Sequence, residues 1–77
     1  MKVFVFINTE LKKEREILQR LRGTRNVEEA FMLYGTYDVV AVIEVDAMGN
    51  LNQIYKMIRR IEGVQSATTM IAIEGKS

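Results

Sequence analysis

The sequence contains neither cysteine nor histidine among its 77 residues. Disulfides, thiolate metal sites and imidazole ligands are therefore excluded, and we expect neither a metal nor a cofactor. Residues suited to nucleophilic or acid–base catalysis are also scarce, because the serines are Ser66 and Ser77 and the aspartates are Asp38 and Asp46. A glycine-rich phosphate loop is missing as well, so we do not expect an enzyme.

An excess of charge of one sign and a long apolar run are missing too. Eleven basic residues stand against ten acidic ones, so the net charge is +1 and nothing favours nucleic acid or an anionic membrane surface as a partner. The apolar run at residues 3–7 is too short for a signal peptide or a membrane span. We therefore expect a cytoplasmic protein that contacts no membrane.

The length indicates one small domain over residues 1–77. A domain of this size buries only about 60% of the surface that its unfolded chain exposes, so a monomer would be marginally stable. The hydrophobic share of 48% supports a real core and not a disordered tail. With disulfides and metals excluded, association of chains is the remaining source of extra stability.

Four segments rich in β-branched and aromatic residues follow no helical period and are predicted to be strands. These segments are residues 2–8, 27–32, 39–45 and 64–74.

Two further segments repeat apolar residues at the spacing of an amphipathic helix. The first spans residues 11–21, with Leu11 on its apolar face, Thr9 as a plausible N-cap and Gly23 at its end. The second runs from residue 47 to residue 61, with Asp46 as its N-cap and Gly63 at its end. The predicted order of elements is βαββαβ.

A short connection joins the two middle strands, and Gly35 within it can take a positive φ, so these strands are predicted to form a hairpin. Right-handed crossovers then place both helices on one face of a four-stranded antiparallel sheet, with a strand of the second half between the first two strands. This is the ferredoxin-like arrangement of the α+β class.

The predicted sheet is apolar on both faces, although two helices cover only one. Phe4 and Phe6 alternate with Val3, Val5 and Ile7 in the first strand. The uncovered face would be an apolar surface of several hundred Å² or more, which is larger than soluble monomers usually expose. We infer a homodimer in which two sheets pack face to face, as in dimeric α+β barrels.

The connection around Gly35 is also the main candidate for a ligand site. It combines backbone N–H groups, the Asp38 carboxylate and the phenols of Tyr34 and Tyr37, with Thr36 between them. Each feature also has a structural interpretation, because aspartate often stabilises a turn and tyrosines pack at strand ends. On the residues alone, both interpretations stay open.

Landmarks spread along the whole chain resemble a known family. They are Val27 and Ala30 after a helix ending in glycine, Tyr34-Gly35-Thr36-Tyr37-Asp38 before an apolar strand, Asp46 before the second helix, Ile61-Glu62-Gly63-Val64, and Thr68-Thr69 leading into Ile71-Ala72-Ile73-Glu74. In this order, they resemble the effector-binding (RAM) domain of the Lrp/AsnC regulators.

The resemblance implies dimers formed through the sheets, assembly into rings of eight or ten chains, and a small effector, usually an amino acid, bound between neighbouring dimers. The candidate ligand-binding residues are Tyr34, Gly35, Thr36, Tyr37, Asp38, Thr68 and Thr69. Backbone N–H groups near Gly35 would take the amino-acid carboxylate and Asp38 the ammonium in a charge-assisted bond.

Family members carry a helix-turn-helix domain before this module, whereas Met1 is followed at once by the first predicted strand. We therefore expect a stand-alone regulatory and oligomerisation module without direct nucleic-acid binding, which could join full-length family regulators in mixed oligomers.

Two alternatives share the predicted fold. An ACT-like regulatory domain also binds amino acids, but its sheets continue edge to edge. A small cofactorless enzyme of the dimeric α+β barrel type would need a cavity between sheet and helices with Tyr or Asp inside. An RNA-recognition module is disfavoured, because the strands lack aromatic pairs set among basic residues.

Overall fold

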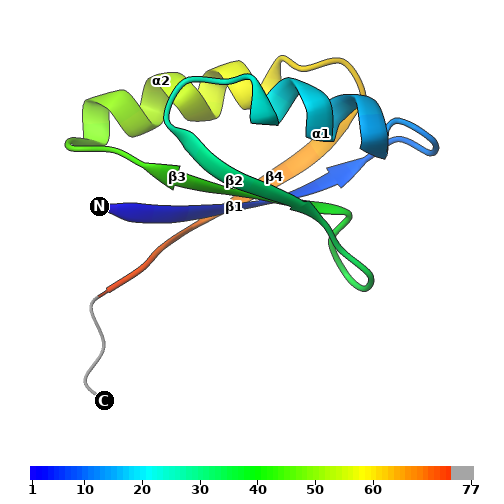
Figure 1. The fold of residues 1–77 in the computed structure, drawn as a ribbon, viewed down its shortest axis with the longest axis horizontal. Helices are drawn as coiled ribbons and strands as arrows, with labels where there is room; N and C mark the ends of the chain where they lie inside the picture. The colour runs from blue at the N-terminus through cyan, green and yellow to red at the C-terminus, as the bar shows by residue number, and fades with distance from the viewer. Residues whose placement is uncertain (74–77) are drawn as a thin grey trace.

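The computed structural model of the protein describes residues 1–73, which form one sheet with two helices on one side of it (Figure 1). In chain order the elements are β1 (Lys2–Thr9), α1 (Glu14–Arg22), β2 (Val27–Met32), β3 (Val39–Glu44), α2 (Met48–Arg59) and β4 (Val64–Ile71). The strands are antiparallel in the order β2-β3-β1-β4, so β3 lies between the first two strands. The predicted ferredoxin-like fold is confirmed.

The strands follow the predicted segments closely. The pairing of β2 with β3 confirms the hairpin, and β1 continues one residue further than predicted, to Thr9. β3 ends at Glu44 and β4 at Ile71, both before their predicted ends. Glu74, the predicted last residue of β4, lies outside the described residues.

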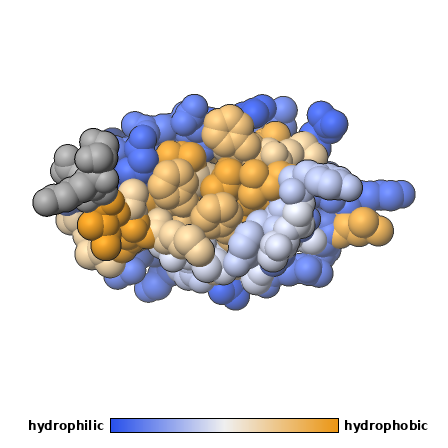
Figure 2. Space-filling view, turned by 90° about the horizontal axis from the view of Figure 1, so that it is seen from below, coloured by the Kyte–Doolittle hydropathy of each residue, from blue (hydrophilic) through white to orange (hydrophobic). Residues whose placement is uncertain are grey.

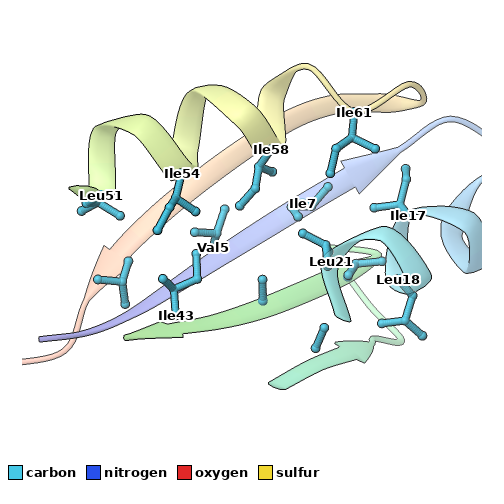
Figure 3. Packing of buried hydrophobic residues seen from close by; sticks show 14 of the residues in the cluster. Val5, Ile7, Ile17, Leu18, Leu21, Ile43, Leu51, Ile54, Ile58 and Ile61 are labelled. Carbon is cyan, nitrogen blue, oxygen red and sulfur yellow. The ribbon is translucent and has the colours of Figure 1, made fainter. Parts of the chain in front are cut away.

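The side of the sheet that faces the helices carries the core. Val3, Val5 and Ile7 of β1 are fully buried, because alternate residues of a strand point to the same face. Figure 3 shows apolar side chains of both helices directed at these strands, with Ile17 and Leu21 from α1 among them. Neither helix has the length and apolar character that a membrane span needs in the described part of the chain.

The first helix begins later than predicted, at Glu14. Thr9 is not its N-cap, because Thr9 belongs to β1 and Lys13 occupies the N-cap position. Leu11 precedes the helix and is 84% exposed, so its predicted place on the buried face is wrong. The predicted end is confirmed, since Gly23 is the C-cap.

The segment between β1 and α1 is a turn that a distant part of the chain holds in place. The Glu10 N–H donates to the Gly63 carbonyl oxygen over 2.7 Å, and Lys12 has a φ of 69°. An α-helix does not accommodate a φ of this sign. Apolar residues at helical spacing therefore extend beyond the part of the chain that is helical.

The second helix also differs from its prediction at both ends. Ala47 is the N-cap in place of Asp46, and no side chain in residues 1–73 bonds to the cap. The helix ends at Arg59, so Ile61 is buried from the turn that follows and Gly63 does not end the helix. The predictions place the helix correctly and miss its caps, because capping depends on the tertiary path of the chain.

The face of the sheet away from the helices remains uncovered in the single chain. We call it the open face; its apolar strand residues are Phe4, Phe6, Phe31, Val40, Val42 and Met70. Figure 2 shows an apolar area, with several aromatic rings, across the middle of this face. Phe31 is 46% exposed and Met70 51%, which confirms that both faces of the sheet are apolar.

Candidate functional site

The connection between β2 and β3 is a closed turn that projects beneath the sheet, on the side away from the helices (Figure 1). The Leu33 N–H donates to the Asp38 carbonyl oxygen over 2.8 Å and closes the turn. Gly35 has a φ of 145°, in the region that favours glycine, and Tyr34 is fully exposed. The N–H groups of residues 34–37 donate to no acceptor within residues 1–73, so they are available to a ligand.

Asp38 joins the turn to the end of β1. Its N–H donates to the Ile7 carbonyl oxygen over 2.9 Å, and its Oδ2 accepts the Thr9 N–H at 2.8 Å and the Thr9 hydroxyl at 3.4 Å. Asp38 therefore has a structural role, although its side chain bonds to Thr9 of β1 and not to an N–H group of its own turn. Within residues 1–73 only Oδ2 carries these bonds, so Oδ1 can still contact a ligand.

Tyr37 connects the turn with the open face. Its ring packs on that of Phe6, with the two centroids 5.2 Å apart and the planes tilted by 42°. Thr68 is the β4 partner of Phe6 in the register, so it points to the same face of the sheet. The structure thus brings Tyr37 and Asp38 together at β1 and places Thr68 beside Phe6 on the same face, while Tyr34, Gly35 and Thr36 are exposed.

Thr69 lies on the other side of the sheet from Thr68. Its register partner is Val5, a core residue, because neighbouring residues of a strand point to opposite faces. It cannot face the turn together with Thr68. The strand alternation of β4 could have separated the two threonines at the sequence level.

Thr69 instead lines a groove between α2 and β4 that the sequence did not reveal. The groove has a volume of about 480 Å³, which is in the range of small-molecule sites. We call it the α2–β4 groove; its residues are Met48, Leu51, Asn52, Tyr55, Thr69 and Ile71. The sign in the sequence was Tyr55, a polar aromatic residue in a helix whose buried residues are aliphatic.

The two places differ in charge. The turn carries the Asp38 carboxylate, whereas the described residues that line the α2–β4 groove include no carboxylate or amine. Arg59 supplies a positive charge at the Tyr55 end of the groove, since its Nη1 donates to the Tyr55 hydroxyl oxygen over 3.3 Å. The Tyr55 hydroxyl in turn donates to the Ala67 carbonyl oxygen over 3.0 Å.

Comparison with known proteins places this architecture in a family. The family described as "Lrp/AsnC ligand binding domain" matches residues 2–76. The HTH-type transcriptional regulator FL11 of Pyrococcus furiosus is 30% identical over 71 residues, which are 92% of this chain and 47% of the regulator. The chain thus spans about half the length of this curated relative.

Solved structures agree with the fold. The hypothetical protein PHS023 of Pyrococcus horikoshii is 36% identical with a TM-score of 0.86, over 96% of this chain and 90% of that one. The regulator NMB0573 of Neisseria meningitidis, solved as a complex with L-Met, has a TM-score of 0.83 at 20% identity, over 95% of this chain and 49% of that one. The chain belongs to the Lrp/AsnC family and corresponds to its ligand-binding domain.

Proposed function

We propose that this chain is a regulatory module that binds an amino acid at the turn between β2 and β3 and dimerises through the open face. The family match over residues 2–76 carries the proposal, because it covers nearly the whole chain and describes a ligand-binding domain. The complex of NMB0573 with L-Met supports an amino acid as the class of effector.

The turn offers complementary groups for the two charges of an amino acid. The free N–H groups of residues 34–37 suit a carboxylate, and Oδ1 of Asp38 suits an ammonium group. Oδ2 of Asp38 is bonded to Thr9, so the carboxylate is already oriented before a ligand arrives. A fixed acceptor costs less entropy on binding than a mobile one. Tyr37 and Thr68 would lie beside the ligand.

The open face supports dimerisation. Its exposed aromatic and methionine side chains, Phe31 and Met70 among them, are removed from water when two sheets pack together. The turn projects from the same side of the sheet, so a dimer places a second chain near the proposed ligand site. Ligand binding and assembly would then be thermodynamically coupled.

A regulatory role is favoured over an enzymatic one. The family match describes a ligand-binding domain. Apolar side chains of both helices pack in the core against the sheet (Figure 3), and the groove at its edge, between α2 and β4, contains Tyr55 but no acidic residue from the described part of the chain. We propose that residues 1–77 are one domain that assembles beyond the dimer and could join full-length regulators of the family in mixed oligomers. DNA binding is not part of the proposal.

Calorimetric titration with each common amino acid, with light scattering on the same samples, tests this function. We expect saturable binding by one class of side chain together with a change in assembly size. Asp38→Asn should weaken binding by roughly 1.5–3 kcal/mol, because it removes the charge that holds the ammonium. This substitution keeps a side-chain oxygen for Thr9, whereas Asp38→Ala would also lose that contact.

Asp46→Asn is the matched control, because Asp46 is exposed and follows the opposite end of β3. It should leave the affinity unchanged. Unchanged affinity in folded Asp38→Asn would remove Asp38 from the site. If no amino acid binds and the oligomer stays intact, the amino-acid assignment fails while the dimer proposal survives.

A further inference from the structure

The α2–β4 groove lies on the helix side of the sheet, whereas the proposed effector turn projects from the other side. We propose that this groove is a second binding site, which takes a small apolar monocarboxylate. The inference goes beyond the proposed function, because it concerns different residues and a ligand of different charge.

The apolar part of the ligand follows from the lining of the groove. Met48, Leu51 and Ile71 form its apolar walls, and a volume of about 480 Å³ accommodates a branched chain of a few carbons with its head group. Met48 is 51% exposed and Ile71 41%, so these side chains lose contact with water when the groove is occupied.

An unsatisfied hydroxyl group marks the floor of the groove. The Thr69 Oγ1 is buried and has no hydrogen-bond partner within residues 1–73. A buried hydroxyl without a partner destabilises a fold, and valine has nearly the same shape without this cost. Rotation about χ1 moves Oγ1 to another staggered position, so Oγ1 can turn toward a ligand in the groove. A ligand acceptor would satisfy it.

The charge of the ligand follows from Arg59. Its guanidinium lies at the Tyr55 end of the groove, and the ion pairs formed within residues 1–73 are Met1 with Glu44 and Lys13 with Glu16. Arg59 therefore has no carboxylate partner in that part of the chain and can pair with the carboxylate of a ligand. Among residues 1–73 no acidic residue lines the groove, so an ammonium group would find no counter-charge from that part of the chain. A monocarboxylate fits better than an amino acid.

Titration with 4-methylpentanoate tests the proposal, with calorimetry for affinity and backbone amide NMR for location. We expect saturable binding with chemical-shift changes at Asn52, Tyr55 and Thr69. The control compound 4-methylpentan-1-ol lacks the carboxylate and should bind about tenfold more weakly. Leucine adds an ammonium group and should bind the groove more weakly than the acid. Absence of saturable binding, or tighter binding of leucine at these amides, overturns the proposal.

Two substitutions locate the contacts. Thr69→Val should weaken binding of the acid about fivefold and raise the melting temperature, since it removes the unsatisfied hydroxyl. Its control is Thr68→Val on the opposite face of β4, which should leave the affinity unchanged. A lower melting temperature of Thr69→Val, or unchanged affinity, would overturn the role of this hydroxyl and with it the proposed site.

Arg59→Gln should weaken the acid about tenfold and leave the alcohol unaffected. Arg60→Gln is its control, because Arg60 is also exposed but, within residues 1–73, does not share the bond of Arg59 to Tyr55. Equal effects of the two substitutions would overturn the role of Arg59. Asp38→Asn separates the two sites: the affinity for the acid should not change, and a parallel loss would place the acid at the turn instead.

Discussion

The two faces of the sheet are built from the same kinds of residues and differ in what covers them. On the helix side, Val5 and Ile7 are fully buried beneath α1 and α2. On the open face, Phe4 and Phe6 alternate with them in the same strand and remain half-buried. A strand that is apolar on both sides needs both sides covered, and the helices of one chain cover only one of them.

This difference between the two faces assigns the stability of the fold to the helix side and the association of chains to the open face. The core on the helix side is complete in one chain, so it sets the stability of the fold. The open face removes its apolar area from water only when another molecule covers it, and we propose that this molecule is a second copy. Substitutions on the two faces should therefore change different measured quantities.

The largest expected effect is on the covered face. Ile58 of α2 is fully buried in the core, and Ile58→Ala should lower the free energy of unfolding by about 2–5 kcal/mol through lost burial and a cavity. Urea denaturation measures this change. Met57→Ala, at a neighbouring position that is 42% exposed, is the control and should cost much less. Similar losses for both variants would show that the core is not packed as described.

The second-largest expected effect comes from a substitution on the open face and changes the affinity of the dimer. Phe4→Lys would place like charges in the proposed interface, so we expect the dimer to weaken at least about 100-fold, or about 2.7 kcal/mol. Sedimentation velocity over a range of protein concentrations measures it. Leu11→Lys is the control, because Leu11 is exposed outside the open face.

An unchanged dimer in Phe4→Lys would contradict face-to-face packing. An edge-to-edge dimer, in which β4 or β2 pairs with a second copy, would give that result. The same experiment therefore separates the proposed assembly from the ACT-like alternative.

A smaller effect on the unfolding free energy is expected at two glycines with positive φ, one on each side of the sheet. At Gly63, with a φ of 98°, an added Cβ would lie 2.9 Å from the Lys13 Cβ, whereas at Gly35 nothing lies within 4 Å. Gly63→Ala should therefore cost about 1–3 kcal/mol of unfolding free energy, and Gly35→Ala about 1 kcal/mol from backbone strain alone. Thermal or urea denaturation of both variants measures the difference. A larger loss for Gly35→Ala would contradict the close contact of Gly63 with α1.

Sequence patterns were sufficient for most of the fold. The alternation in β1 and the helical spacing of apolar residues in α1 predicted both elements, but the alternation did not show which face of β1 the helices cover. Leu11 continued this spacing into a segment that is not helical, because the Glu10–Gly63 hydrogen bond and the positive φ of Lys12 hold a turn there. Periodicity shows which face of an element is apolar, and it does not show where a distant contact ends that element.

The candidate site was predictable only in part. The turn and the presence of Asp38 in it follow from local residues, but the partner of Asp38 is Thr9, which lies 29 positions away. Thr68 and Thr69, predicted to lie near one ligand, point to opposite faces of the sheet. The α2–β4 groove combines residues of two elements that no local pattern connects.

The sequence by itself determined the βαββαβ order and the apolar character of both sheet faces, because these depend on spacings of two to four residues along the chain. Only the tertiary structure decided the helix starts, the bond between Asp38 and Thr9, and the separation of Thr69 from the turn. These features depend on hydrogen bonds and register between segments far apart in sequence, which form only when the sheet has assembled.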